Sequence, residues 1–200
     1  MGRAVAELSS PADLIAAAEA GDDAAWEALV DRFSSLVWAV ARGHGLGPAD
    51  AADVSQTVWL RLAEHLGTLR EPAKVGTWLA TAARFESLRL LRTAHRQVPA
   101  DLPTEVPGAL PPTPGADGPV LEAERNAALW RAFEDLPLPC KRLLRVLMAD
   151  PAPSYADASA ALDMPVGSIG PRRARCLAHL RACLELFDEP PARAGAGTDR

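Results

Sequence analysis

Apolar residues recur along the chain at the spacing of amphipathic helices. The clearest run consists of Trp26, Leu29, Val30, Phe33, Val37 and Val40. Its i, i+3, i+4, i+7 pattern gives one apolar stripe on a helix of 3.6 residues per turn. β-Branched runs are few, and no strand-like alternation is sustained, so we predict an all-α protein.

Glycine, proline and capping residues divide the N-terminal half into four predicted helices. Gly21 ends the first helix, Asp22 or Asp23 caps the second, and Pro48 opens the third. The predicted ranges are Ala12–Ala20, a second helix that ends at the glycines of 43–47, Ala49–Leu66, and Val75 to beyond Arg92. A loop over 70–74 separates the last two.

Seven prolines lie within residues 98–119, and such a density prevents helix formation. We therefore predict a flexible, acidic linker there. The predicted organisation is two small helical domains at 10–97 and 120–188, joined by the linker 98–119 and followed by a disordered tail at 189–200.

The C-terminal half has the pattern of a helix-turn-helix domain. Its predicted helices are Val120–Phe133, Lys141–Met148, Tyr155–Leu162 and a longer one from Ser168 or Gly170 to Phe187. Ser154 is placed to cap the third of these helices. With Ser168 as N-cap of the last one, Pro171 would occupy a first-turn position that needs no N–H partner.

Charge and composition narrow the class of protein. The net charge is −5, but residues 167–181 carry four arginines and a histidine with no acid. The local charge of such a segment matters more for nucleic-acid binding than the net charge of the whole chain. No signal peptide and no apolar run of roughly 20 residues is visible, so we expect a soluble cytoplasmic protein without membrane contact. Three cysteines, an odd number, argue against a secreted disulfide framework.

Two helix faces in the N-terminal domain are candidate binding surfaces. On the third helix Asp53, Gln56 and Leu60 share a face flanked by Trp59, which suits a protein partner. The alternative is that Trp59 and Leu60 pack on a neighbouring helix. The fourth helix and the loop before it offer aromatic and basic residues of the kind that bind single-stranded DNA, namely Lys74, Thr77, Trp78, Phe85, Arg89, Arg92 and Arg96. Here the alternative is a solvated basic face with Trp78 and Phe85 in the core.

The last helix carries a third candidate surface. Arg172, Arg175 and His179 point together, and arginines near the start of such a helix can reach phosphates or guanine in the major groove. Arg173 is expected to lie further inward. Cys176, His179 and Cys183 resemble a metal set, but core packing of the cysteines is the better interpretation. We find no catalytic constellation, and we expect no enzyme, no metal and no cofactor.

These features together resemble the extracytoplasmic-function (group IV) class of bacterial sigma factors. Residues 51–62 (AADVSQTVWLRL) are similar to the segment that grips the clamp of the large polymerase subunit, and residues 77–84 (TWLATAAR) to the helix that melts the minus-ten element. Residues 154–155 and 164–169 (MPVGSI) are similar to the helix-turn-helix that reads the minus-thirty-five element. The resemblance implies a sigma region 2-like bundle and a sigma region 4-like domain.

By that resemblance each surface receives a role. Core polymerase would be bound by Asp53, Gln56, Trp59 and Leu60. The minus-ten strand would be bound by Lys74, Thr77, Trp78, Phe85, Arg89 and Arg92, with the loop at about 70–76 capturing a flipped base. The minus-thirty-five element would be bound by Ser154, Tyr155, Ser168, Arg172, Arg173 and Arg175.

The chain departs from the family at several positions. Phe85 stands where many members have Asn at the base-reading position. Ala158, Ser159 and Asp163 replace the usual Ile, Ala and Gly of the helix-turn-helix. Asp tolerates the left-handed conformation better than most residues, so the turn at 163 should still form.

We therefore predict a sigma factor that directs promoter recognition, melting and transcription initiation. Its expected partners are core RNA polymerase, through the clamp of the large subunit and the flap of the other, and promoter DNA; an anti-sigma factor is a further partner left open. Two alternatives remain at this stage. One is a stand-alone helix-turn-helix regulator, and the other is a sigma-like adaptor that binds polymerase without reading promoters.

Overall fold

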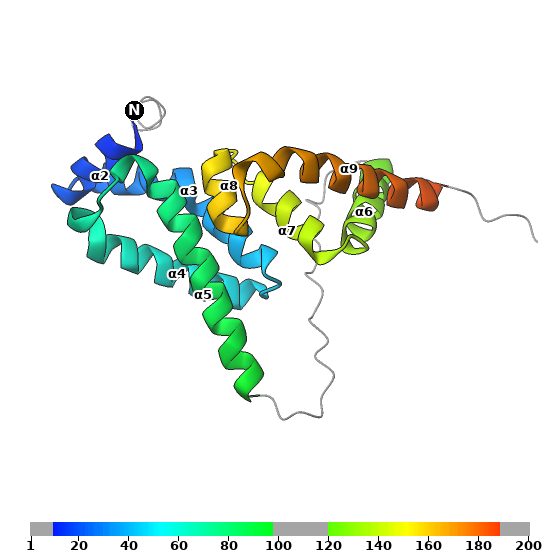
Figure 1. Cartoon of the computed structure of the whole chain (residues 1–200), viewed down its shortest axis with the longest axis horizontal. Helices are drawn as coiled ribbons and strands as arrows, with labels where there is room; N and C mark the ends of the chain where they lie inside the picture. The colour runs from blue at the N-terminus through cyan, green and yellow to red at the C-terminus, as the bar shows by residue number, and fades with distance from the viewer. Residues whose placement is uncertain (1–9, 98–119, 189–200) are drawn as a thin grey trace, which may run out of the picture.

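The computed structural model describes residues 10–97 and 120–188 as helices joined by short turns (Figure 1). The N-terminal helices are α2 (Pro11–Glu19), α3 (Asp23–Gly43), α4 (Pro48–His65) and α5 (Val75–Gln97), with the 3-10 turns η1 (Leu66–Thr68) and η2 (Pro72–Lys74). The C-terminal helices are α6 (Val120–Glu134), α7 (Leu138–Leu147), α8 (Tyr155–Leu162) and α9 (Val166–Asp188). Within these ranges there is no strand, which confirms the all-α prediction. The predicted linker and tail lie outside the described residues.

Side-chain caps start several helices, at Asp22 and Ser154 as predicted and at Ser10, which was not predicted. Ser10 and Asp13 form a capping box at α2, and Asp22 accepts hydrogen bonds from the first amides of α3. Ser154 and Asp157 form a second capping box at α8, which confirms Ser154 as its N-cap. Such caps stabilise a helix by about 1 kcal/mol each because they satisfy amides that have no helical partner.

Two predicted helix starts are wrong. α7 begins earlier, at Leu138, because Pro139 sits in its first turn, where a missing N–H does no harm. α9 begins at Val166, so Ser168 lies within the first turn and is not the N-cap. Pro171 consequently lies inside the helix. None of the described helices is long and apolar enough to cross a lipid bilayer.

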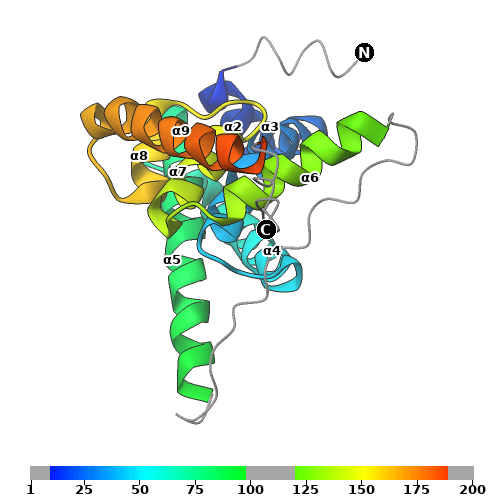
Figure 2. The ribbon, with the colours of Figure 1, turned by 90° about the vertical axis from the view of Figure 1, so that its right-hand side faces the viewer.

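One hydrophobic core runs through both halves of the chain. In the N-terminal half it contains the fully buried Leu29, Val37, Val58, Leu62 and Leu79, and in the C-terminal half Leu143, Leu144, Ala158, Ala161 and Ile169. Figures 1 and 2 show α7 lying against α3, and α8 against α5. The two predicted domains are therefore in close contact in this structure.

Polar contacts also join the halves. They are Asp150 N–H to Ser35 Oγ (3.0 Å), Arg142 Nε to Gly43 O (3.2 Å), Arg145 Nη1 to Arg42 O (2.9 Å), Thr77 Oγ1 to Asp157 Oδ1 (2.7 Å) and Arg84 Nη2 to Asp163 Oδ2 (2.5 Å). The α7 arginines thus satisfy carbonyls at the C-terminus of α3, which have no partner within that helix.

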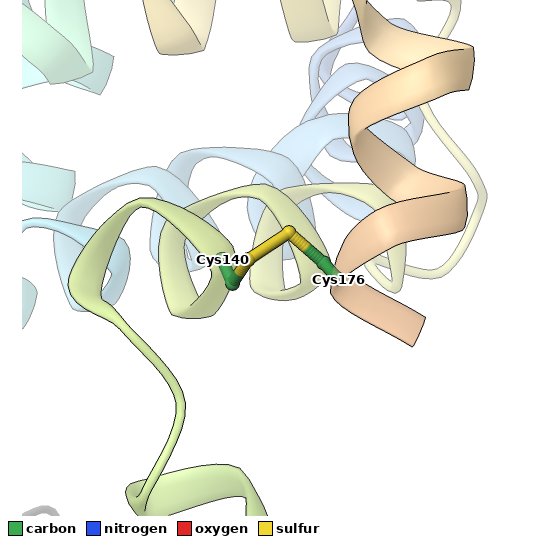
Figure 3. The surroundings of a disulfide bond; sticks show 2 residues. All are labelled: Cys140 and Cys176. Carbon is green, nitrogen blue, oxygen red and sulfur yellow. A yellow bond between two sulfur atoms is a disulfide. The ribbon is translucent and has the colours of Figure 1, made fainter. Parts of the chain in front are cut away.

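A disulfide bond links Cys140 on α7 to Cys176 on α9 (Figure 3). The Cα atoms are 5.3 Å apart and the cysteines are separated by 36 positions in the sequence. Burial of Cys176 agrees with the sequence interpretation, but the pairing with Cys140 was missed. The third cysteine, Cys183, is free and half-buried.

Candidate polymerase and nucleic-acid interfaces

The exposed face of α4 is the first candidate interface. Asp53, Gln56 and Leu60 are all exposed, and 59% of Leu60 is accessible, so its packing on a neighbouring helix is ruled out. Trp59 is half-buried and stacks edge-on against Trp26, with ring centroids 5.9 Å apart. The packing alternative therefore holds for Trp59 and not for Leu60.

The turns between α4 and α5 form an open hollow of about 580 Å³. It is lined by His65, Thr68, Leu69, Arg70, Glu71, Lys74, Thr77, Trp78 and Thr81. The loop and the start of α5 thus come together as the sequence predicted. His65, Thr68, Leu69 and Thr81 were missed, although Thr81 lies one helical turn after Thr77 and could have been found by that spacing.

One ring contact and two polar contacts position side chains that line this hollow. The ring centroids of His65 and Trp78 lie 6.5 Å apart, and Lys74 pairs with Glu71 at 2.9 Å. Both members of that ion pair are well exposed, so it restrains Lys74 only weakly. Thr77 is half-buried and donates a hydrogen bond from its hydroxyl to Asp157.

The second half of α5 exposes an aromatic and basic face. Phe85 is 55% accessible, and Arg89 and Arg92 are exposed on the same side, so the core alternative for Phe85 is wrong. The Arg84 guanidinium lies over the Phe85 ring, 5.3 Å from its centroid. The side chain of Arg96 lies outside the described residues.

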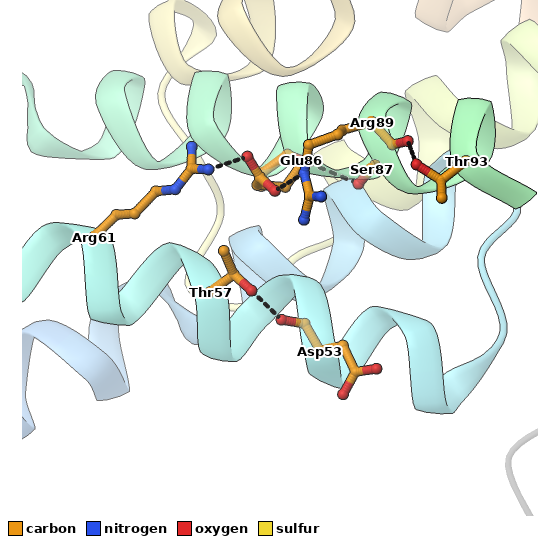
Figure 4. A network of polar contacts seen from close by, with 8 residues as sticks. Asp53, Thr57, Arg61, Glu86, Ser87, Arg89 and Thr93 are labelled. Carbon is orange, nitrogen blue, oxygen red and sulfur yellow. Dashed lines mark hydrogen bonds and ion pairs between the residues drawn. The ribbon is translucent and has the colours of Figure 1, made fainter.

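Behind this face lies a buried carboxylate that the sequence did not reveal. Glu86 is 4% accessible and joins α4 to α5, because it pairs with Arg61 at 2.6 Å and with Arg89 at 2.7 Å (Figure 4). Only Nε of Arg89 is used in this contact, so its terminal nitrogens are directed away from Glu86. Glu86 therefore positions Arg89, a predicted DNA-binding residue, and also ties α5 to Arg61 of the helix predicted to bind polymerase.

The start of α9 and the cap of α8 make the third candidate interface. Ser154, Tyr155, Arg172, Arg173 and Arg175 are all exposed, so Arg173 does not lie inward as predicted. The basic stripe on α9 faces solvent with no carboxylate of its own helix beside it until Glu185. Its exposure and charge suit contact with a DNA backbone.

The turn between α8 and α9 accommodates the unusual residues at 159 and 163. Asp163 adopts the left-handed conformation, with φ 54° and ψ 51°. Ser159 donates a hydrogen bond of 2.6 Å to the carbonyl oxygen of Met164, which closes the turn. The turn therefore forms without the usual glycine.

Three features bear on the metal and cofactor expectations. Cys176 is bonded to Cys140 and so is not a thiolate ligand. Among the described residues no group of three or more His, Cys, Asp or Glu side chains could hold a metal ion. His179 is exposed on α9.

Comparison with known proteins defines the class. Residues 29–97 match the family model Sigma-70 region 2. CnrH, solved in complex with the cytosolic domain of CnrY, is similar in structure with a TM-score of 0.57 and 23% identity, over 90% of this chain and 100% of that one. The sigma factor RpoE of Bartonella quintana, solved with the anti-sigma factor NepR, has a TM-score of 0.55 and 20% identity, over 80% and 96%. No curated protein matches the chain.

Residues 29–97 are therefore similar to Sigma-70 region 2, and the chain shares its fold with a sigma factor. These findings agree with the predicted resemblance to sigma factors and confirm the all-α fold. The roles of individual residues stay predictions.

Proposed function

We propose that the chain is an RNA polymerase sigma factor that binds core polymerase and directs promoter recognition, DNA melting and transcription initiation. The observation that supports this most is the hollow of about 580 Å³ between α4 and α5, lined by Trp78 and followed on α5 by exposed Phe85. It lies in the domain that matches Sigma-70 region 2.

The hollow and the exposed face of α5 would hold the opened minus-ten strand. A base turned out of the duplex would enter the hollow and lie beside Trp78, with Lys74 near its phosphate. Phe85 would stack on a further base, and Arg89 and Arg92 would bind the phosphates that follow. Unstacking costs a few kcal/mol per base, so several such contacts are needed to keep the strand open.

The exposed face of α4 would dock on the clamp of the large polymerase subunit. Leu60 supplies an accessible apolar group at its centre, flanked by the polar side chains of Asp53 and Gln56. Trp59 would contribute from beneath by holding α4 on Trp26. An apolar centre with a polar rim is the usual composition of a protein interface.

The helix-turn-helix would read the minus-thirty-five element. α9 would enter the major groove with Arg172 and Arg175 toward the bases or phosphates, while Arg173 and Ser168 bind the backbone. Ser154 and Tyr155, at the exposed start of α8, would contact the neighbouring phosphates. The flap of the other large subunit would support this domain.

Partners and location follow from this role. The protein would act with polymerase in the cytoplasm and would carry out no chemistry of its own. RpoE was solved with an anti-sigma factor, which makes a protein of that kind a reasonable additional partner for this chain.

The test is to mix the purified protein with core RNA polymerase and a randomised promoter library, and to sequence the 5′ ends of the transcripts. Starts that share two upstream elements at fixed spacing, absent with core alone, would support the proposal and supply the promoter sequence. An absence of stimulated starts would refute it.

Co-purification with core polymerase then separates the two alternatives. An adaptor would retain core polymerase without stimulating starts. A stand-alone regulator would bind a specific duplex tightly without polymerase, and it would do so as a dimer.

A further inference from the structure

We propose that the buried acid Glu86 strengthens binding of the opened promoter strand, because it holds Arg89 in position to contact a phosphate. This inference rests on the proposed function, since it concerns the strand-binding face of α5. Glu86 itself touches no DNA and acts only through Arg89. A carboxylate behind a DNA-binding face would otherwise weaken binding, because it repels the phosphates.

Glu86 is almost fully buried between α4 and α5, and only 4% of it is accessible. Each of its carboxylate oxygens has one arginine partner. Oε1 pairs with Nη2 of Arg61 at 2.6 Å, and Oε2 accepts a hydrogen bond from Nε of Arg89 at 2.7 Å (Figure 4). Burying a carboxylate is costly unless its oxygens find such partners. The burial of Glu86 therefore requires both guanidinium groups to stay in place.

The same contact restricts the movement of Arg89. The side chain of Arg89 is 62% exposed, and a long exposed side chain loses rotamer entropy when it is fixed by a ligand. Glu86, three positions earlier in α5, binds Nε and so orients the plane of the guanidinium group. The contact leaves out the two terminal nitrogens, whose N–H groups form the fork that a phosphate accepts.

Arg89 lies on the exposed face of α5 between two other residues proposed to bind the strand. It follows Phe85 by four positions and precedes Arg92 by three, so the three side chains are neighbours on that face. A strand whose base stacks on Phe85 would have its adjoining phosphate near Arg89. Because Arg89 is fixed before the strand arrives, less entropy is lost on binding.

Arg61 provides an internal comparison, because it binds the other oxygen of the same carboxylate from α4. Its side chain is not part of the proposed strand-binding face. If Glu86 only held α4 on α5, loss of Arg61 and loss of Glu86 would have the same consequences. Under the proposal they differ, because only the loss of Glu86 releases Arg89.

The experiment measures strand affinity by fluorescence anisotropy, with the full chain assembled on core polymerase at saturating concentration. The probe is a single-stranded minus-ten oligonucleotide taken from the library starts, and binding to core alone is subtracted. The variants are Glu86→Gln, Arg89→Gln, Arg61→Gln and the double variant Glu86→Gln/Arg89→Gln. Glu71→Gln is the matched control for loss of an acid, since Glu71 is exposed and pairs with Lys74 of the proposed strand-binding surface.

Glu86→Gln should bind the oligonucleotide about threefold to tenfold more weakly than the parent, which corresponds to the cost of ordering one released side chain. Arg89→Gln should weaken binding at least as much and should reduce the salt dependence by about one phosphate contact. Arg61→Gln should bind as the parent does. Glu71→Gln should bind as tightly as the parent or more tightly, because it removes a charge that repels DNA.

The double variant isolates the positioning effect. Without Arg89 there is nothing for Glu86 to position, so adding Glu86→Gln to Arg89→Gln should leave the affinity unchanged or raise it. Equal or tighter binding by Glu86→Gln in the parent background would overturn the proposal. An equal loss of affinity in Arg61→Gln would also overturn it, because Glu86 would then have only a structural role.

A measurement without DNA tests the positioning directly. In isotope-labelled protein the Nε–H proton of Arg89 should exchange with water more slowly than that of the exposed Arg92, and Glu86→Gln should abolish this difference. Equal exchange of the two protons in the parent would overturn the proposal. If the parent stimulated no starts at all, the proposed function would fail, whereas the exchange rates would still decide whether Glu86 fixes Arg89.

Discussion

The disulfide between α7 and α9 should be a major source of stability for the helix-turn-helix domain. Replacing both cysteines by alanine, or reducing them, releases a constraint across 36 positions of the chain. In the chain-entropy relation a loop of that length changes the entropy of the unfolded state by about 13 cal/mol/K, or about 3.8 kcal/mol at 25 °C. Beyond Pro171, Cys176 is the one buried side chain among the described residues of α9, where Leu177 and Leu180 are only partly buried against the core.

The assay is thermal unfolding followed by circular dichroism, with oxidised and reduced samples compared. A loss of about 3.8 kcal/mol in a chain of this size lowers Tm by about 8–15 °C. The variant Cys140→Ala/Cys176→Ala should unfold at the temperature of the reduced parent and should not respond to reductant. Because most cytosols keep thiols reduced, the oxidised sample must be verified by thiol titration before the comparison.

Cys183→Ala serves as the matched control, since this cysteine is free. It should retain the reductant response of the parent. Equal Tm values for the oxidised and reduced parent would refute the reasoning. The disulfide would then not lower the entropy of the unfolded chain by the amount that the loop length predicts.

Three further predictions concern other parts of the molecule. Glu86→Ala should lower the free energy of unfolding by about 2 kcal/mol in urea titrations, because it removes a hydrogen-bonded charge between two arginines; a midpoint shift no larger than that of an exposed Glu→Ala variant would contradict this. Burial, aided by the nearby cations of Arg142 and Arg84, lowers the pKa of His44 below 6.5 in the folded chain. As the pH falls, the unfolded chain therefore binds this proton before the folded chain does. The free energy of unfolding, fully present above about pH 6.5, should decline as the pH falls further. His44→Gln should flatten that decline in Tm measured from pH 7.5 to 5.5, and an unchanged slope would show that other groups cause it. Arg172→Ala and Arg175→Ala should abolish promoter-directed starts while core polymerase still co-purifies, since each groove contact contributes about 1–3 kcal/mol; loss of core binding as well would count against this division of roles.

Most helices and their exposed faces could be predicted from the sequence. The apolar stripe of α3 and the exposed position of Arg172 follow from the 3.6-residue period, which is a local property of the chain. For Leu60 and Phe85 the period left a packed alternative open, and only the structure showed that both are exposed. Caps such as Ser154 also act within a single turn, so their effect could be read from neighbouring residues. The class of protein followed from the order of these motifs.

Contacts between distant residues were decided only by the tertiary structure. Periodicity shows which face of a helix is apolar but not which helix covers it, so the pairing of Cys140 with Cys176 and the burial of Glu86 between two arginines were not predictable. α9 starts at Val166 and continues through Pro171, although proline is disfavoured inside a helix, so local preference alone did not predict this start. Asp163 was identified only as a departure at a turn; its partner Arg84 lies 79 residues away, and only the folded chain brings the two charges together.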